Sequence, residues 1–391
     1  MRIRLVVIVA IGATCFLAGP LGYVGVGTLA SSSAAGASVH RLTATPMTSR
    51  PSEATQPGCS ATGFASPVGS VGYWLAGADG SVYSCGNAPW YGSLPSMGIT
   101  PDGPVVGIAG CSTGYLLTTS RGAVYAFGSA HYLGGADTLP LTGPIVGIVA
   151  TPGCWGGYWL VSANGGVFTY GADANFLGSA GGLHLSKPMV GMAAPTEPIA
   201  TCIVAREPCA SAYWQVAADG GVFTYNSPGN VGNSEGTVLG SSANFLGSTG
   251  CLTLNKPIVG MAASPDTTDV GSNTACNSGP LGPGGYWLVA SDGGMFAFGN
   301  APFLGSTGCL VLNEPIVGMM VSTDTTTVGN KSACLPRNGP GGSFHLAPGG
   351  YTMVASDGGV FAFGNAPFGG SLPGSGISVN DVVGIAPAGA S

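Results

Sequence analysis

The stretch GYWLVASDGGMFAFGNAPF, residues 285–303, decides the fold, because close copies of it recur along the chain. The copies begin at six tyrosines: Tyr73, Tyr115, Tyr158, Tyr213, Tyr286 and Tyr351. Successive tyrosines are 42, 43, 55, 73 and 65 residues apart. A short apolar run, such as IVGM at residues 258–261, precedes the copies from the second onward. A repeat with a period in the forties, built from strand-like units, indicates a β-propeller.

Each copy has the pattern of a β-hairpin. The dipeptide Asp292-Gly293 is favoured in two-residue type I′ turns, because both of its positions need a positive φ. With this dipeptide as the turn, Val289 faces Phe296 and Trp287 faces Phe298, so that these four side chains share one face of the hairpin. The other face is also apolar. Such a hairpin must therefore lie between neighbouring sheets.

A ring of sheets buries both faces of every hairpin and removes exposed strand edges. We predict four strands in each unit: the apolar run, the two hairpin strands and an outer strand such as Phe303–Gly305. The fold class is then all-β, a single β-propeller with four-stranded antiparallel blades. Six tyrosine motifs predict six blades, with seven as the alternative. Four tryptophans should occupy equivalent buried positions between blades: Trp74, Trp159, Trp214 and Trp287.

The two ends of the repeat region determine how the ring closes. Residues 62–65 are expected to form the first strand of the first blade. Residues 382–386, VVGIA, match the apolar run once more. They either close the ring beside the first blade or belong to a degenerate seventh blade. A glycine within each run, such as Gly260, leaves room where strands crowd near the propeller axis.

The order PIVGMA, GYWLVASDGG, FAFGN and LG is similar to the repeat of the regulator-of-chromosome-condensation propellers. It resembles more closely a glycine-rich repeat of secreted actinobacterial proteins. The similarity covers nearly all of residues 58–391 and implies a β-propeller, but no catalytic residue. The glutamine of the usual Gly-Gln-Leu-Gly ending is absent here. The exchange-factor role of the nuclear members is not implied for a secreted chain.

The first 57 residues differ in composition from the repeats. Arg2 and Arg4, the apolar residues 5–17 and the small residues 35–37 predict a secretion signal over residues 1–37. An uncleaved membrane anchor is the alternative. Residues 38–57 are rich in Ser, Thr and Pro and predict a flexible linker, and residues 58–391 form the propeller domain. We therefore expect a secreted or extracellular protein, with no membrane span in the mature chain.

The composition excludes one class of partner and ordinary disorder. Charged residues make up 7% of the chain, which has 10 Lys and Arg and a net charge of -6. Nucleic acid is therefore excluded as a partner, because its binding needs clustered basic residues. The 45% hydrophobic content excludes a chain disordered by low hydrophobicity and high charge.

The chain has 11 cysteines, and Cys15 lies in the predicted signal, which leaves an even ten. Outside the cytoplasm this number favours disulfides. Two pairs lie 25 residues apart at matching places in successive repeats, and a third pair lies within one insertion. The predicted bonds are Cys251–Cys276, Cys309–Cys334 and Cys202–Cys209. The sequence leaves Cys59, Cys85, Cys111 and Cys154 without assigned partners. Clustered zinc ligands such as Cys-x-x-Cys do not occur, so we predict no metal site.

The least repetitive segments are four insertions, and they indicate where a partner would bind. Residues 195–212, 264–284 and 322–349 fall between the first and second strands of a blade, and residues 226–242 between the third and fourth. In an up-and-down blade both connections leave on the same face, and loops gathered on one face often form a binding surface. Neutral decoration is the alternative. The candidate binding residues are Arg206, Glu207, Arg337, Phe344 and His345.

The sequence thus predicts a secreted, non-catalytic binding or scaffold module at the cell envelope or outside the cell. Carbohydrate or cell-wall polymer is the first ligand class, and an extracellular protein is the other. A secreted hydrolase or lyase is one alternative, because a fold does not determine a function. A purely structural surface protein is the other. No catalytic residue and no cofactor are predicted.

Overall fold

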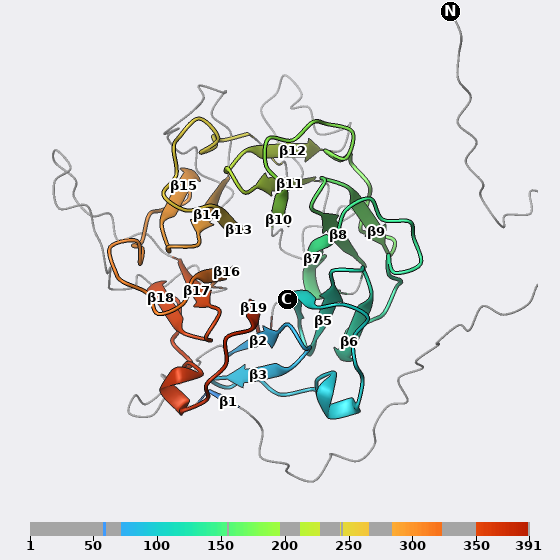
Figure 1. Cartoon of the computed structure of the whole chain (residues 1–391), viewed down its shortest axis with the longest axis vertical. Coiled ribbons are helices and arrows are strands. Elements are labelled where there is room, and N and C mark those ends of the chain that lie inside the picture. The colour runs from blue at the N-terminus through green and yellow to red at the C-terminus, as the bar shows by residue number, and fades with distance from the viewer. Residues whose placement is uncertain are drawn as a thin grey trace, which may run out of the picture. The chain divides into compact units, whose positions relative to one another are not determined.

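The computed structural model describes residues 58–59, 72–154, 156–195, 212–226, 243, 245–265, 284–322 and 349–389. The predicted signal and linker and most of the four insertions lie outside these residues. The described part of the chain is all-β and contains 19 strands and three short 3-10 helices, η1 (Pro95–Met97), η2 (Pro152–Cys154) and η3 (Pro373–Ser375) (Figure 1). Among the described residues no helix is long and apolar enough to cross a membrane.

The described strands form six sheets, five of three strands and one of four. In each sheet an inner, a middle and an outer strand pair antiparallel in sequence order, except that the first sheet takes its inner strand from the C-terminus. From inner to outer strand, the sheets are β19 (Val382–Pro387), β2 (Tyr73–Gly77) and β3 (Val82–Cys85), with β1 (Gly58–Cys59) parallel to β3; β4 (Val105–Cys111), β5 (Gly114–Thr119) and β6 (Val124–Gly128); β7 (Ile145–Ala150), β8 (Tyr158–Ser162) and β9 (Val167–Tyr170); β10 (Met189–Ala193), β11 (Ala212–Ala217) and β12 (Val222–Asn226); β13 (Ile258–Ala263), β14 (Gly285–Ala290) and β15 (Met295–Gly299); β16 (Ile316–Val321), β17 (Gly350–Ala355) and β18 (Val360–Gly364).

The inner strands form a closed ring (Figure 1). In chain order β4, β7, β10, β13, β16 and β19 each contact the next, and β19 contacts β4. Because β19 pairs with β2, residues 382–386 close the ring beside the first blade, which is the first of the two alternatives that the sequence left open. β19 occupies the place predicted for residues 62–65, which lie outside the described residues. The repeated antiparallel sheets are thus arranged around an axis in the manner of a propeller.

The predicted fourth strand, antiparallel and following the hairpin, is wrong in all six sheets: five have three strands, and the fourth strand of the first sheet, β1, comes from before the hairpin and pairs parallel. Residues 303–305, expected as an outer strand, are not a strand. Their backbone groups bond instead to a side chain of the next sheet: the Leu304 N–H donates to the Tyr351 hydroxyl at 3.1 Å, and the Gly305 carbonyl accepts from it at 2.5 Å. These groups are therefore not used to pair with the outer strand.

The predicted hairpin turn is also wrong, by one residue. The Ala290 N–H donates to the Gly294 carbonyl, and the Gly293 N–H to the Ala290 carbonyl, both at 2.8 Å. Gly293 has a φ of +78°, so the loop contains three residues and ends in a left-handed glycine. The register shifts accordingly, and Trp287 pairs with Ala297.

This register changes which side chains share a face. Tyr286 and Phe298 pair on one face, and Trp287 lies on the other with Val289. Both faces belong to buried clusters, which confirms that the hairpin lies between neighbouring sheets. The burial predicted for the four tryptophans is confirmed as well, because none of Trp74, Trp159, Trp214 and Trp287 is more than 3% exposed.

A tyrosine near the start of each middle strand joins its sheet to the preceding one. The Tyr286 hydroxyl donates to the Gly247 carbonyl at 2.5 Å and accepts from the Leu246 N–H at 3.2 Å. Both partners lie in the connection that follows the preceding outer strand. The Tyr286 ring also packs against Trp214 of that preceding sheet, with ring centroids 5.5 Å apart. We call this pair of hydrogen bonds the tyrosine latch.

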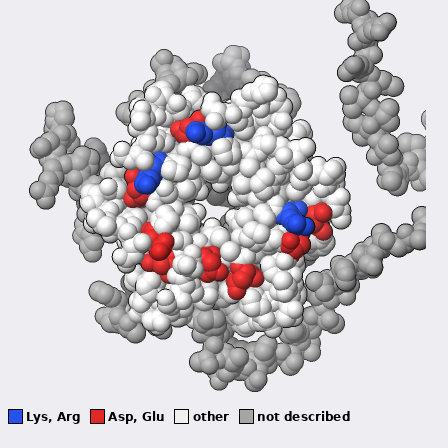
Figure 2. All heavy atoms as spheres, in the orientation of Figure 1, with Lys and Arg blue, Asp and Glu red and all other residues white. Residues whose placement is uncertain are grey.

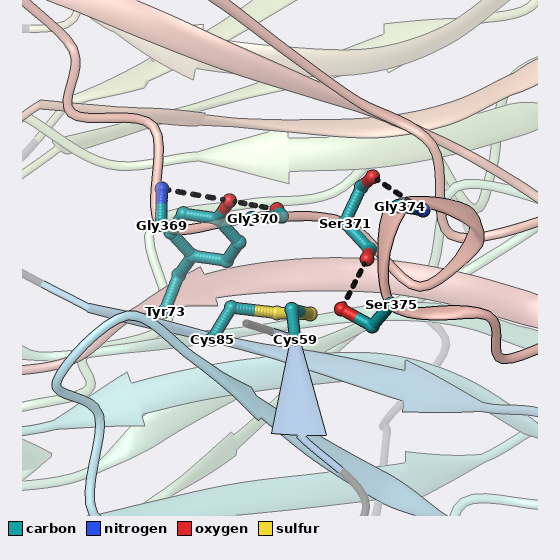
Figure 3. Close-up of a disulfide and its surroundings, with 8 residues drawn as sticks. All are labelled: Cys59, Tyr73, Cys85, Gly369, Gly370, Ser371, Gly374 and Ser375. Atoms are coloured by element: carbon teal, nitrogen blue, oxygen red, sulfur yellow. Dashed lines mark hydrogen bonds between the residues drawn. A yellow bond between two sulfur atoms is a disulfide. The ribbon is translucent and has the colours of Figure 1, made fainter. Parts of the chain in front are cut away.

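The latch is present in all six sheets. The six tyrosines have no exposed surface. Besides the two latches given above, the hydroxyl donates to one backbone carbonyl and accepts from one N–H in four more: Tyr115 with Gly92 and Tyr91, Tyr158 with Gly134 and Leu133, Tyr213 with Gly178 and Leu177, and Tyr73 with Gly370 and Gly369. The Tyr73 latch joins the first sheet to the connection after β18 and so closes the ring (Figure 3).

Two disulfides pair the cysteines that the sequence left unassigned. Cys59–Cys85 joins β1 to β3 beside the Tyr73 latch, with Cα atoms 4.5 Å apart (Figure 3). Cys111–Cys154, at 5.3 Å, joins the end of β4 to η2, in the connection between β7 and β8. Both bonds therefore lie at sheet edges or between neighbouring sheets.

Cys251 and Cys309 are also disulfide-bonded. Their predicted partners, Cys276 and Cys334, lie outside the described residues, as does the predicted pair Cys202–Cys209. These three pairings stay predictions.

Replacing Tyr286 with Phe should lower the free energy of unfolding by about 1–3 kcal/mol, because the Gly247 carbonyl and the Leu246 N–H lose a buried partner. Urea unfolding measures the change. Tyr225→Phe is the matched control, since this half-buried ring packs on Tyr213 and its hydroxyl makes no hydrogen bond within the described residues. Equal stability of the two variants would contradict the latch.

Candidate functional site

The candidate residues Arg206, Glu207, Arg337, Phe344 and His345 all lie outside the described residues, so their roles stay predictions. The structure does describe the strands to which the insertions attach. Three insertions follow the ends of the inner strands β10, β13 and β16, and the fourth follows the end of the outer strand β12. In these antiparallel sheets the end of the inner strand, the start of the middle strand and the end of the outer strand share one edge. We call this edge of the ring the insertion end, and the opposite edge, with the hairpin turns, the turn end.

A row of aromatic side chains follows the outer strands. Each row member comes directly before the residue whose N–H donates to a latch. Phe176 is 60% exposed and Tyr132 is 59% exposed. The aromatic row consists of Trp90, Tyr132, Phe176, Phe245, Phe303 and Phe368. Four of the six rings are exposed, Tyr132, Phe176, Phe303 and Phe368, whereas Trp90 and Phe245 are half-buried. The exposed rings form a surface suited to flat apolar ligands.

Sequence reasoning missed the aromatic row because it assigned residues 303–305 to a strand. The signal was present, since an aromatic residue comes directly before Leu-Gly in four of the repeats. The latch fixes the Leu-Gly backbone, as it does at Leu304 and Gly305. The preceding side chain is consequently directed to the outside of the ring, as the 40% exposure of Phe303 shows.

A small cavity of about 120 Å³ lies at the axis, lined by all six inner strands. Its lining is valine, isoleucine, methionine and glycine, with no ionisable side chain among the described lining residues. A Cβ on Gly107 would lie 3.3 Å from Ile148 Cγ2 of the next inner strand, which is a tight contact. At Gly147, Gly191 and Gly318 the nearest atoms would be 3.5 Å or more away, so crowding of the inner strands does not require glycine there. The cavity offers apolar contacts and backbone polar groups.

Most charged side chains of the described residues lie at the turn end. The residues just before the inner strands lie next to the hairpin turns: Lys187, Lys256 and Glu314 are two positions before their strands, and Asp381 directly precedes β19. An example of the contact is the bond from the Asn164 side chain to the hydroxyl of Thr142, three positions before β7, at 2.6 Å. Two sheets combine opposite charges at these positions, and two combine like charges. The opposite pairs are Lys187 with Asp219 and Lys256 with Asp292; the like pairs are Glu314 with Asp357 and Asp381 with Asp79. Figure 2 shows acidic groups alone over the neighbouring sheets that contain β16–β19, β2 and β3.

Burial raises the pKa of the latch tyrosines above the ordinary value of about 10. For Tyr213 burial raises the pKa to about 12, while the hydrogen bond from Leu177 acts in the opposite direction. A neutral hydroxyl can donate to a carbonyl, whereas a phenolate cannot. The burial that raises these pKa values therefore keeps the latch hydroxyls neutral and able to join neighbouring sheets.

No family model matches the sequence, and no curated protein matches it. The family resemblance inferred from the repeat therefore stays a prediction. Among solved structures, the chain is similar to BBS1N in complex with ARL6DN, with 11% identity, 76% of each chain covered and a TM-score of 0.35. It is similar to human WBSCR16 at 16% identity, over 75% of this chain and 73% of that chain, with a TM-score of 0.29. For BamB from Moraxella catarrhalis the identity is 11%, the coverage 77% and 82%, and the TM-score 0.32.

The class of the protein follows from its own contacts. It is an all-β repeat protein whose three-stranded antiparallel sheets are arranged like propeller blades in a ring. The insertions attach at one end of that ring, and the acidic pairs lie at the other.

The latch predicts a loss of stability at alkaline pH. The pKa of Tyr213 is about 12 in the folded chain and about 10 when unfolded, so the unfolded chain releases its protons first as the pH rises. The stabilisation is complete below about pH 10 and is lost above it, by up to about 1.4 kcal/mol per pH unit for each tyrosine. Urea unfolding between about pH 9 and pH 11 measures this slope. A constant free energy of unfolding over that range would contradict the prediction.

Proposed function

We propose that the chain is a closed six-bladed β-propeller that acts as a secreted, non-catalytic binding or scaffold module at the cell envelope or outside the cell. The six described sheets and the closed ring of inner strands support six blades. The bonded cysteines, including Cys59–Cys85 and Cys111–Cys154, support an oxidising compartment. The glycine-rich repeat supports kinship with the secreted actinobacterial proteins that it resembles.

The observation that carries the proposal is the attachment of all four insertions at the insertion end. The latches already join neighbouring sheets through residues outside these segments, such as Gly247 and Gly305. A rigid frame with variable loops at one end is the arrangement that binding proteins use. The insertion end is therefore the proposed binding face, with Arg206, Glu207, Arg337, Phe344 and His345 as its candidate contacts.

Carbohydrate or cell-wall polymer is the proposed ligand class. Sugar rings have apolar C–H faces that pack on aromatic rings, and a neutral polymer needs few charged contacts. The aromatic row offers such rings at repeated positions, and the chain has only 7% charged residues. A polymer that contacts two or more of these rings gains avidity from their spacing.

The function is tested with a screen of glycans and peptidoglycan against the full chain and against a variant shortened within residues 322–349 that retains Cys334. The variant should keep its melting temperature, because β16 and β17 lie outside the shortened segment. Its binding should weaken. Phe176→Ala should weaken binding about tenfold, whereas Leu183→Ala, an exposed apolar residue outside the aromatic row, should not.

Binding that survives shortening of all four insertions would contradict the assignment to the insertion end. Turnover of the bound polymer would favour the hydrolase or lyase alternative. A chain that binds none of the ligands while retaining its fold would favour the structural alternative.

A further inference from the structure

A second surface lies at the turn end, away from the insertions. A groove of about 410 Å³ runs between the connection before β16 and the hairpin of β17 and β18, and Ser371 and Pro373 form its third side. We call it the turn-end groove. Its walls include Leu310, which is 45% exposed, and Val311, which is fully exposed.

Two carboxylates stand in this apolar groove. Glu314 precedes the inner strand, and Asp357 lies in the hairpin turn of the same sheet. The Ser356 hydroxyl donates to Glu314 Oε2 at 3.3 Å, which orients that carboxylate. No lysine or arginine belongs to the described lining. The neighbouring like pair, Asp381 with Asp79, extends the negative charge beyond the groove (Figure 2).

The preceding repeat shows which residues set this chemistry. Residues 248–261 read STGCLTLNKPIVGM, and residues 306–319 read STGCLVLNEPIVGM. Only two of these positions differ, Thr253 against Val311 and Lys256 against Glu314. Val311 and Glu314 both line the turn-end groove. The two differences therefore make the same place more apolar and reverse the sign of one charge.

We propose that the turn-end groove binds a basic peptide segment of a partner protein, through one lysine or arginine side chain. The aliphatic stem of that side chain lies along Leu310 and Val311, and the cationic head lies between Glu314 and Asp357. The volume of the groove is near the lower end of the range for binding pockets, about 300–1,000 Å³, which suits one long side chain and its flanking residues.

The chemistry of the walls favours a peptide over a metal ion. Calcium takes six to eight oxygen ligands, and most of the lining here is apolar, including Leu312, Val360 and Phe361. Within the described residues no three acidic, histidine or cysteine side chains gather in a way that could hold an ion. An apolar groove with a negative end instead matches a long cationic side chain.

The test uses the full chain and a labelled peptide, acetyl-Ala-Leu-Lys-Leu-Ala-amide, followed by methyl NMR. The signals of Leu310, Val311 and Leu312 should shift, and the affinity should fall with added salt. The same peptide with Glu in place of Lys should not bind. Val311→Thr with Glu314→Lys, which recreates the preceding repeat, should weaken binding about tenfold without changing the melting temperature.

The reciprocal variant is a gain-of-function test. Thr253→Val with Lys256→Glu should keep the original site and add a second one, so that two peptides bind per chain. An unchanged affinity in the Val311→Thr, Glu314→Lys variant would overturn the proposal. Equal binding of the Glu peptide, a single site in the reciprocal variant, or displacement of the peptide by calcium chloride at constant ionic strength would overturn it as well.

Discussion

A neutral tyrosine hydroxyl, buried between two sheets, is the interaction on which the rest of the structure depends. Apolar packing holds the sheets together but does not by itself fix their spacing, because it has no direction. The hydroxyl of Tyr286 fixes the spacing, since it donates to one backbone carbonyl and accepts from one N–H in the connection that follows the preceding outer strand. The same pair of bonds occurs six times, and the one at Tyr73 joins the first sheet to the connection after β18. The repeat is therefore a latch residue with a matching connection, as well as a set of strands.

The latch constrains the sequence near the insertion end of the ring but not at the turn end. Near the latch, the connection is held by its backbone, so the side chain before the donor N–H takes no part in the latch, and four of the six aromatic rings at this position are exposed. Beyond the latch, the connection returns to the turn end, and Val311 and Glu314 in this part of it are not latch residues. Their identities can change between repeats without loss of the frame, and at this position they do. The same scaffold thus supports two surfaces of different chemistry.

The sequence predicted the repeated hairpins, the all-β class and the buried tryptophans, because periodic apolar patterns record these features directly. For residues 382–386 it left two alternatives, ring closure or a seventh blade, and the pairing of β19 with β2 selects the first. It did not predict the turn, because the run Asp292-Gly293-Gly294 allows a two-residue or a three-residue loop and only the hydrogen bonds select one. The absence of the fourth strand in most described sheets was not predictable either, since residues 303–305 bond to Tyr351, 46 residues or more away. Arg206 and His345 lie in insertions that have no counterpart in the other repeats, so the repeat pattern does not predict where their side chains lie.

Amide hydrogen exchange at the latch donors tests the account most directly. Leu133, Leu177, Leu246 and Leu304 lie outside the strands, yet each donates its N–H to a buried tyrosine hydroxyl. If the latches join the sheets, these four amides open only when neighbouring sheets separate, and they should exchange as slowly as strand amides such as that of Val289. Exchange as fast as that of exposed connections would contradict the central claim, because the sheets would then be held together without the latch.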